Sequence, residues 1–374
     1  MTRVVFAPDS FKGSIGAADA ATALAEGWRS VRPGDETVLR PMADGGEGTL
    51  EAFAAAVPGA VRRPVVVIGP DGRAVESSWL LLPPTADAPR GTAVVELAST
   101  SGIELLGERR LGADAGTEGF GQAIAAALDA GVSRLVLGIG SSASTDGGAG
   151  VLAALGARIL DGEGRAIAPG VRGLDTVASV DLSSLRPLPP GGVVVLTDVT
   201  NPLLGERGSA AVFGAQKGLT GGEISVADAA LARFATLVAA KAPAADPETP
   251  GAGAAGGAGF GLCAWGARIR PGADDVAALI GLPEVVATAS VVITGEGSFD
   301  AQSAAGKVPA QVARLAHAVG TRAALVAGRV SPDADTSAFA ASVSLSELAG
   351  SPEDALADPA RWLREAAATL AHRR

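Results

Sequence analysis

The sequence predicts an α/β fold of two domains with largely parallel sheets, and three observations lead to it. The chain has 374 residues, more than one hydrophobic core usually organises. Apolar residues make up 48% of it, which argues against disorder. Short β-branched runs alternate with Ala- and Leu-rich helical segments, a pattern typical of parallel strands joined by crossover helices.

The elements follow in chain order. Seven runs predict strands: RVVFAP, ETVLRPM, AVVELA, RLVLGIG, GVVVLTDV, SVVITGEG and RAALVAG. Helical periodicity between and after them predicts helices over residues 17–30, 49–56, 118–130, 149–155, 225–241, 309–319 and 352–372.

Composition narrows the class of function. A net charge of −10 argues against a nucleic-acid partner and favours a small ligand or a protein. The N-terminus lacks a signal h-region and the uncharged stretch 251–267 is too rich in Gly and Ala for a membrane span, so we expect a soluble, cytoplasmic protein. With one cysteine and two histidines remote from acids, proton handling would fall to carboxylates or lysine.

Lysine usage is informative because the chain has only four lysines beside 26 arginines. Three of them adjoin glycine: Lys12, Lys217 and Lys307. A lysine in a Gly-rich corner can reach a phosphate as a compact point charge. The alternative is that these are ordinary turn lysines.

Five of the predicted strands end in loops that combine glycines, hydroxyls and acids: APDSFKGS, MADGGEGT, GIGSSASTDGG, TDVTNPL and TGEGSFD. Ligands of open α/β sheets bind beyond the carboxyl ends of the strands, where helix N-termini favour anions. Each loop alone would be read as a turn with a helix cap. Together they predict a site for an anionic ligand with a metal.

Known phosphate-binding motifs fit poorly. No P-loop is present. That motif needs Ser or Thr directly after its Gly-Lys pair, and here Val308 follows the only Gly-Lys pair. Gly138, Gly140 and Ala143 match G-x-G-x-x-A after a strand, which raises the alternative of an NAD(P)-dependent oxidoreductase. Against it, Gly147 and Gly148 fall where the helix should already be under way.

The strings APDSFKGS, PMADGGEGT, DVTNPL, FGAQKG, PGAGAAGG and TGEGSFDAQSAAGKVP resemble, in the same order, the motifs of the bacterial glycerate kinase family (type 1) of the glyoxylate and glucarate pathways. The resemblance spans nearly the whole chain. The family's usual residues differ at four positions, where this chain has Ser141, Thr145, Ala215 and Ser298. A non-catalytic nucleotide or sugar-acid sensor on the same fold is the alternative that these departures would support.

The resemblance implies ATP-dependent phosphorylation of D-glycerate with Mg²⁺, at the 2-position in preference to the 3-position. It also implies that residues 1–64 and 283–374 form a flavodoxin/Rossmann-like domain. Residues 65–282 would then form an inserted second α/β domain, with the active site in the cleft between the two. A homo-oligomer is compatible with this organisation.

Residue roles follow from what phosphoryl transfer needs: an acid as base, carboxylates for the metal, and cations or backbone N–H groups for phosphates. Asp198 is the favoured base and Asp44 its rival, although an Asx-turn explains Asp198 equally well. Lys12 is assigned to catalysis and phosphate contact. The metal ligands are expected at Glu296 and Asp300, the latter an equally good helix cap.

The remaining assignments concern binding. Nucleotide and phosphate contacts are expected from Ser10, Lys307, Gly45, Gly46, Gly295 and Gly297. A second polar loop is expected to hold either nucleotide or the glycerate carboxylate, and its residues are Ser142, Ser144, Thr145 and Asp146. Asn201, Gln216 and Lys217 are expected to orient substrate hydroxyls, with turn roles as the alternative.

Overall fold

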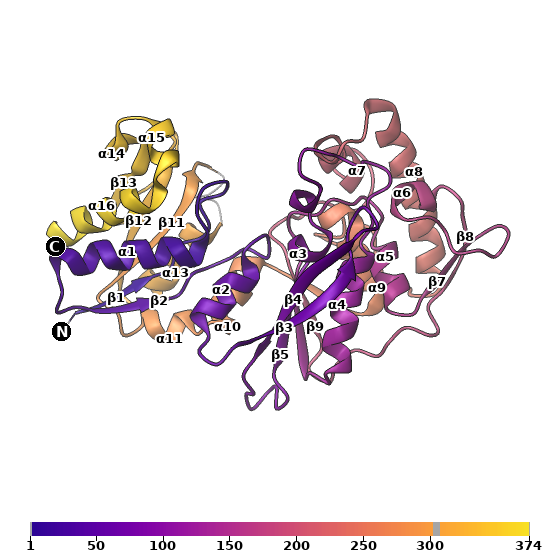
Figure 1. Ribbon diagram of the computed structural model, residues 1–374, viewed down its shortest axis with the longest axis horizontal. Helices are drawn as coiled ribbons and strands as arrows, with labels where there is room; N and C mark the ends of the chain where they lie inside the picture. Colours follow the sequence, from indigo (N-terminus) through magenta and orange to yellow (C-terminus); the bar gives the residue numbers. More distant parts are fainter. Residues whose placement is uncertain (1, 302–306, 374) are drawn as a thin grey trace. The chain divides into compact units, whose positions relative to one another are not determined.

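The computed structural model of the protein describes residues 2–301 and 307–373 (Figure 1). The chain forms two compact units. Unit 1 comprises Met1–Asp44, Glu51–Pro58 and Ala273–Arg374, and unit 2 comprises Gly45–Leu50 and Gly59–Gly272. The boundary expected after residue 64 falls inside a strand of unit 2, and the one expected before residue 283 falls inside a helix of unit 1.

Unit 1 is built on a five-stranded parallel sheet with the order β13-β12-β11-β1-β2. Counted within the unit, this is the doubly wound order 2-1-3-4-5, which confirms the predicted flavodoxin-like α/β class. Val4 lies opposite Val291 on one side and Thr37 on the other. The strands are β1 (Arg3–Phe6), β2 (Glu36–Leu39), β11 (Val291–Phe299), β12 (Arg322–Val330) and β13 (Ala341–Ser344).

Helices α1 (Ala17–Val31) and α16 (Pro359–His372) pack against each other and share one core with the sheet. Phe6 and Trp28 meet edge to face in this core, with ring centroids 6.4 Å apart. Other helices of this part of the chain are α2 (Thr49–Ala56), α10 (Gly272–Leu279), α11 (Leu282–Val286), α13 (Val308–Ala318), α14 (Leu345–Ala349) and α15 (Pro352–Ala357).

The prediction of one helix over residues 352–372 is wrong, because the segment forms two helices, α15 and α16. Pro359 has no N–H to donate and disfavours the helical conformation at the residue before it. Asp358 instead caps α16, its side chain accepting a hydrogen bond from the Arg361 N–H. The break lets α15 turn away from α16.

Unit 2 contains a six-stranded mixed sheet with the order β10-β9-β6-β5-β4-β3. It is parallel from β10 to β5 and antiparallel at β4 and β3. The strands are β3 (Val61–Ile68), β4 (Ala74–Leu82), β5 (Thr92–Glu96), β6 (Arg134–Gly138), β9 (Val193–Leu196) and β10 (Arg268–Arg270), and a separate hairpin pairs β7 (Arg158–Asp161) with β8 (Val177–Asp181).

The helices of unit 2 surround a core that includes Phe120, Phe234 and Phe260. Helix α8 begins at Gly221, earlier than expected, because the Glu223 carboxylate accepts from the Thr220 N–H in a capping box. The main helices are α3 (Ala98–Ser101), α4 (Glu118–Asp129), α5 (Ala149–Ala154), α6 (Gly170–Leu174), α7 (Ser209–Phe213), α8 (Gly221–Ala239) and α9 (Ala258–Trp265).

The missed hairpin β3–β4 shows why edge strands escape prediction. β3 is mostly exposed and carries Arg62, Arg63 and Pro64, residues that protect a sheet edge and hide the apolar alternation.

None of the helices in the described ranges combines the length and the apolar character needed to cross a bilayer.

Candidate active site

A cavity of about 590 Å³ lies at the carboxyl ends of the strands of unit 1. All five strands contribute to its lining: residues 9–12 follow β1, Asp44 follows β2, residues 296–298 end β11, residues 328–329 end β12, and residues 345–346 follow β13. The cavity therefore spans the β1/β11 switch point, where doubly wound sheets bind ligands. Its volume is in the range of small-molecule sites.

The cavity lining has a charged side and an apolar side. Three cations line it, Lys12, Lys307 and Arg329, together with the acids Asp9, Asp44 and Glu296. The apolar side is formed by Leu345, Pro352, Ala355, Leu356 and Pro359, from α14, α15 and the start of α16. Such a lining suits a ligand that is anionic at one end and apolar at the other.

Glycines bring the strand ends close together. A Cβ on Gly297 would lie 3.2 Å from the Lys12 backbone nitrogen, and one on Gly328 would lie 2.4 Å from the Gly297 carbonyl oxygen. Gly295 is tighter still, since its Cβ would meet the Val326 carbonyl oxygen at 1.9 Å. These glycines allow the β1 loop, β11 and β12 to approach one another, a packing need that holds without any ligand.

The predicted metal ligands differ in position. Glu296 is 7% exposed on β11 and lines the cavity, whereas Asp300 follows the end of β11 and is not among the lining residues. Within residues 2–301 and 307–373, no group of three or more His, Cys, Asp or Glu side chains is close enough to hold a metal. Mg²⁺ usually takes one or two carboxylates and completes its shell with phosphates and water, so Glu296, a carboxylate of the cavity lining, fits a Mg²⁺–phosphate ligand.

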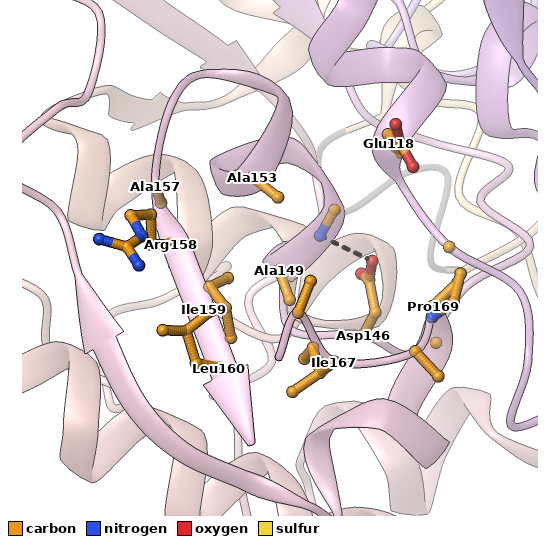
Figure 2. A pocket seen from close by; sticks show the side chains of 15 residues that line it. Glu118, Asp146, Ala149, Ala153, Ala157, Arg158, Ile159, Leu160, Ile167 and Pro169 are labelled. Atoms are coloured by element: carbon orange, nitrogen blue, oxygen red, sulfur yellow. Dashed lines mark hydrogen bonds between the residues drawn. The ribbon is translucent and has the colours of Figure 1, made fainter. Parts of the chain in front are cut away.

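The loop of residues 141–146 in unit 2 is buried. The Asp146 carboxylate accepts hydrogen bonds from Thr117 N (2.9 Å), Thr117 Oγ1 (2.7 Å), Gly148 N (3.1 Å) and Gly150 N (3.2 Å). Burial raises the pKa of this carboxyl, against the lowering effect of these donors. Figure 2 shows Asp146 among residues lining a second cavity, of about 310 Å³, whose walls are largely Ala, Gly, Ile and Pro.

Lys217 also holds this loop, through hydrogen bonds from its ammonium group. Its Nζ donates to Ser142 Oγ (2.7 Å) and to the Ser144 carbonyl oxygen (2.6 Å), and the residue is only 3% exposed. Burial lowers the pKa of the ammonium to about 7, and the charge of Asp146 partly offsets this. The hydroxyls of Ser144 and Thr145 are buried and have no hydrogen-bond partner among the residues that the structure describes. The contacts of Asp146 and Lys217 hold this loop in place without any ligand.

The other three residues expected in unit 2 are Asp198, Asn201 and Gln216. Asp198 is exposed after β9, and its Oδ1 accepts from the Gly272 N–H at 2.8 Å. Asn201 Nδ2 donates to the Arg207 carbonyl oxygen at 2.8 Å, and Gln216 is exposed. Asp198 is thus an exposed acid of unit 2, whereas Asp44 is one of the three acids that line the same cavity as Lys12.

The corner after Asp44 packs on the sheet of unit 2. Gly45 has φ 95°, and a Cβ there would lie 2.4 Å from the Leu196 carbonyl oxygen. The Gly140 N–H donates to the Gly45 carbonyl at 3.0 Å, and a Cβ on Gly140 would lie 2.5 Å from Gly46 Cα. Packing therefore requires these glycines whether or not they also approach a ligand.

Asp9 and Arg329 line the cavity of unit 1 and escaped the sequence reasoning. Asp9 follows β1 as Asp44 follows β2, and Arg329 directly follows the predicted strand RAALVAG, so the strand-end rule applied to single residues would have found both. The apolar side offered no such signal. The motif TGEGSFDAQSAAGKVP falls partly on residues 302–306, which lie outside the described residues.

Comparison with known proteins decides the class. The model of the glycerate kinase family matches residues 4–373, nearly the whole chain. The chain belongs to the glycerate kinase family. It is 40% identical over 336 residues to glycerate kinase of Bacillus subtilis strain 168, covering 89% of this chain and 86% of the relative. It is 41% identical over 317 residues to glycerate 2-kinase of Escherichia coli K12, covering 84% and 82%.

A solved structure agrees with this membership. The protein provisionally named glycerate kinase 2 of Salmonella typhimurium LT2 superposes with a TM-score of 0.85 at 39% identity, covering 100% of this chain and 98% of that one. As a glycerate kinase family member the chain is a phosphotransferase, and kinases of this kind use ATP. The oxidoreductase alternative is wrong, since α5 begins only at Ala149, well beyond Ala143, where the dinucleotide fingerprint would open its helix.

Proposed function

We propose that this protein transfers the γ-phosphoryl group of ATP to the 2-hydroxyl of D-glycerate, with Mg²⁺, giving 2-phosphoglycerate and ADP. The supporting observation is that one cavity, at the ligand-binding edge of a flavodoxin-type sheet, holds Lys12 and Lys307 together with Asp44 and Glu296. The E. coli relative is named glycerate 2-kinase, which supports the 2-position over the 3-position. The cytoplasmic location, the homo-oligomer and the cleft between two domains stay predictions.

In this proposal the cavity of unit 1 binds ATP. Lys12 and Lys307 neutralise the phosphates, and Ser10 adds a hydroxyl donor. Phosphoryl transfer requires mainly positioning and charge stabilisation from the protein, and little covalent chemistry. Glu296 would hold Mg²⁺, aided by Asp300 directly or through water, and the ion would supply neutralisation of charge on the transferred group. The apolar side takes the base of the nucleotide.

We assign the general base to Asp44 because it lines the same cavity as the phosphate-binding lysines. The glycerate hydroxyl oxygen forms the new bond to the γ-phosphorus, the bond to the β–γ bridging oxygen breaks, and the hydroxyl proton passes to Asp44. Asp198 of unit 2 is the rival base, and Asn201 and Gln216 are proposed to contact glycerate. The burial of Asp146 and Lys217 supports structural roles for them.

The test is a coupled assay of ADP release with ATP and D-glycerate, followed by phosphorus NMR of the product. Asp44→Asn should lower kcat by roughly 10²- to 10⁴-fold, the usual contribution of a general base. Asp87→Asn, at an exposed acid that does not line the cavity, is the matched control. Near-normal turnover in Asp44→Asn with loss in Asp198→Asn would move the base to Asp198. ATP binding without any ADP release would favour the sensor alternative.

A further inference from the structure

We propose that Arg329 is a third cationic contact for the phosphates of the nucleotide, beside Lys12 and Lys307. The inference rests on the proposed function, because it assigns a specific role within the same cavity. It also explains why a long, exposed cation lies one residue before the end of strand β12, at this edge of the sheet.

Strand register places Arg329 over the cavity. β11 and β12 pair in parallel, with Ser298 opposite Arg329 and Phe299 opposite Val330. Residues paired across neighbouring strands project from the same face, so Ser298 and Arg329 point to the same side. Both line the cavity. Because Ser298 is short and uncharged, it leaves space for the guanidinium and does not neutralise it.

The charge of Arg329 is available to a ligand. Several other arginines of unit 1 are paired with acids: Arg3 with Glu36, Arg314 with Asp274 and Arg364 with Glu26. Arg329 is exposed, and no described carboxylate lies within 4 Å of its guanidinium nitrogens, nor does its side chain hydrogen-bond to another described residue. An exposed guanidinium of this kind can bind a phosphate group through two parallel N–H groups.

The sheet order indicates which part of the nucleotide Arg329 meets. β12 lies between β13, which leads to the apolar side at Leu345, and β11, which carries Glu296; β1, with Lys12 beyond it, comes next. A nucleotide with its base on the apolar side and its transferred phosphate near Lys12 crosses the end of β12. Arg329 therefore meets the α- or β-phosphate, and we expect it to affect ATP and ADP alike.

The test compares Arg329→Gln with wild-type enzyme by steady-state kinetics and by calorimetric titration of ADP. We expect the KM for ATP and the Kd for ADP to rise at least about tenfold, the usual size of a lost charge-assisted hydrogen bond. The KM for D-glycerate and the melting temperature should stay unchanged. Arg329→Lys should recover part of the loss, since it restores the charge but not the two-pronged geometry.

The matched control is Arg322→Gln, since Arg322 is an exposed arginine at the opposite end of the same strand and should leave all constants unchanged. A double variant, Ser298→Arg with Arg329→Ser, should regain most of the affinity lost in Arg329→Ser alone, because the two positions share one face. Wild-type constants for ATP and ADP in an active Arg329→Gln enzyme would overturn the inference, and failure of the double variant would overturn its register argument. Wild-type protein that releases no ADP would instead overturn the proposed function.

Discussion

Replacing Gly140 with alanine tests the packing of the corner that follows Asp44. The added Cβ would lie 2.5 Å from Gly46 Cα and 3.2 Å from the Gly46 nitrogen, both backbone atoms that no side-chain rotation can move. Ordinary contact begins at 3.4 Å, so the corner must shift by nearly an ångström. The backbone of Gly140 is not left-handed, so alanine adds this contact without dihedral strain.

Overpacking of this kind costs about 1–3 kcal/mol of unfolding free energy. A displacement of about 1 Å in a segment next to a reacting group can lower kcat by roughly 10²-fold. We therefore expect both losses in Gly140→Ala, measured by urea unfolding and by ADP release. Gly162→Ala is the matched control, because Gly162 is exposed with nothing within 4 Å of the added Cβ, and it should change stability by less than about 0.5 kcal/mol.

The reasoning would be refuted if Gly140→Ala were as stable and as active as wild type. That result would mean that the corner at residues 45–48 does not press on the end of β6. Loss of activity with unchanged stability would also contradict the packing argument, since the same contact is the source of both effects.

Two further predictions concern the buried loop of unit 2. Ser141 has φ 59°, a left-handed conformation that costs a residue with a side chain roughly 1–2 kcal/mol. Ser141→Gly should therefore stabilise the protein by up to about 1 kcal/mol, after the greater flexibility of glycine in the unfolded chain is subtracted. An unchanged free energy of unfolding in urea would contradict this. Lys217 has a pKa lowered to about 7, so above pH 7 the folded state releases a proton that the unfolded state keeps, and stability should rise with pH by up to about 1.4 kcal/mol per unit. Lys217→Met should flatten that rise between pH 7 and 8.5, and an unchanged slope would show that the lysine is not titrating there.

Much of the fold could be predicted from local sequence patterns. The seven predicted strands all form, as β1, β2, β5, β6, β9, β11 and β12, because β-branched runs between turn residues report backbone preference directly. The edge hairpin β3–β4 and the break at Pro359 were missed. At the hairpin, exposure hides the apolar alternation, and at Pro359 an apparently continuous helical periodicity masked the stop signal.

The candidate site divides in the same way. Strand-end loops and Gly-adjacent lysines pointed to Lys12, Asp44, Glu296 and Lys307, and the structure brings these four into one cavity. The same signals pointed to Asp146 and Lys217, whose side chains are buried and hold a loop. In the sequence, a turn acid or lysine that lines a cavity looks the same as one that is buried and holds a loop. The difference is burial, which is set by segments distant in the sequence.

The sequence by itself determined the α/β class, the family and the residue types available for phosphate chemistry, since these depend on local periodicity and on the order of short motifs. Only the tertiary structure decided which of those residues share a cavity, that Arg329 joins them, and that Asp146 and Lys217 are enclosed. The reason is physical: sheet order and register place residues hundreds of positions apart side by side, and the solvation of a charge depends on everything packed around it.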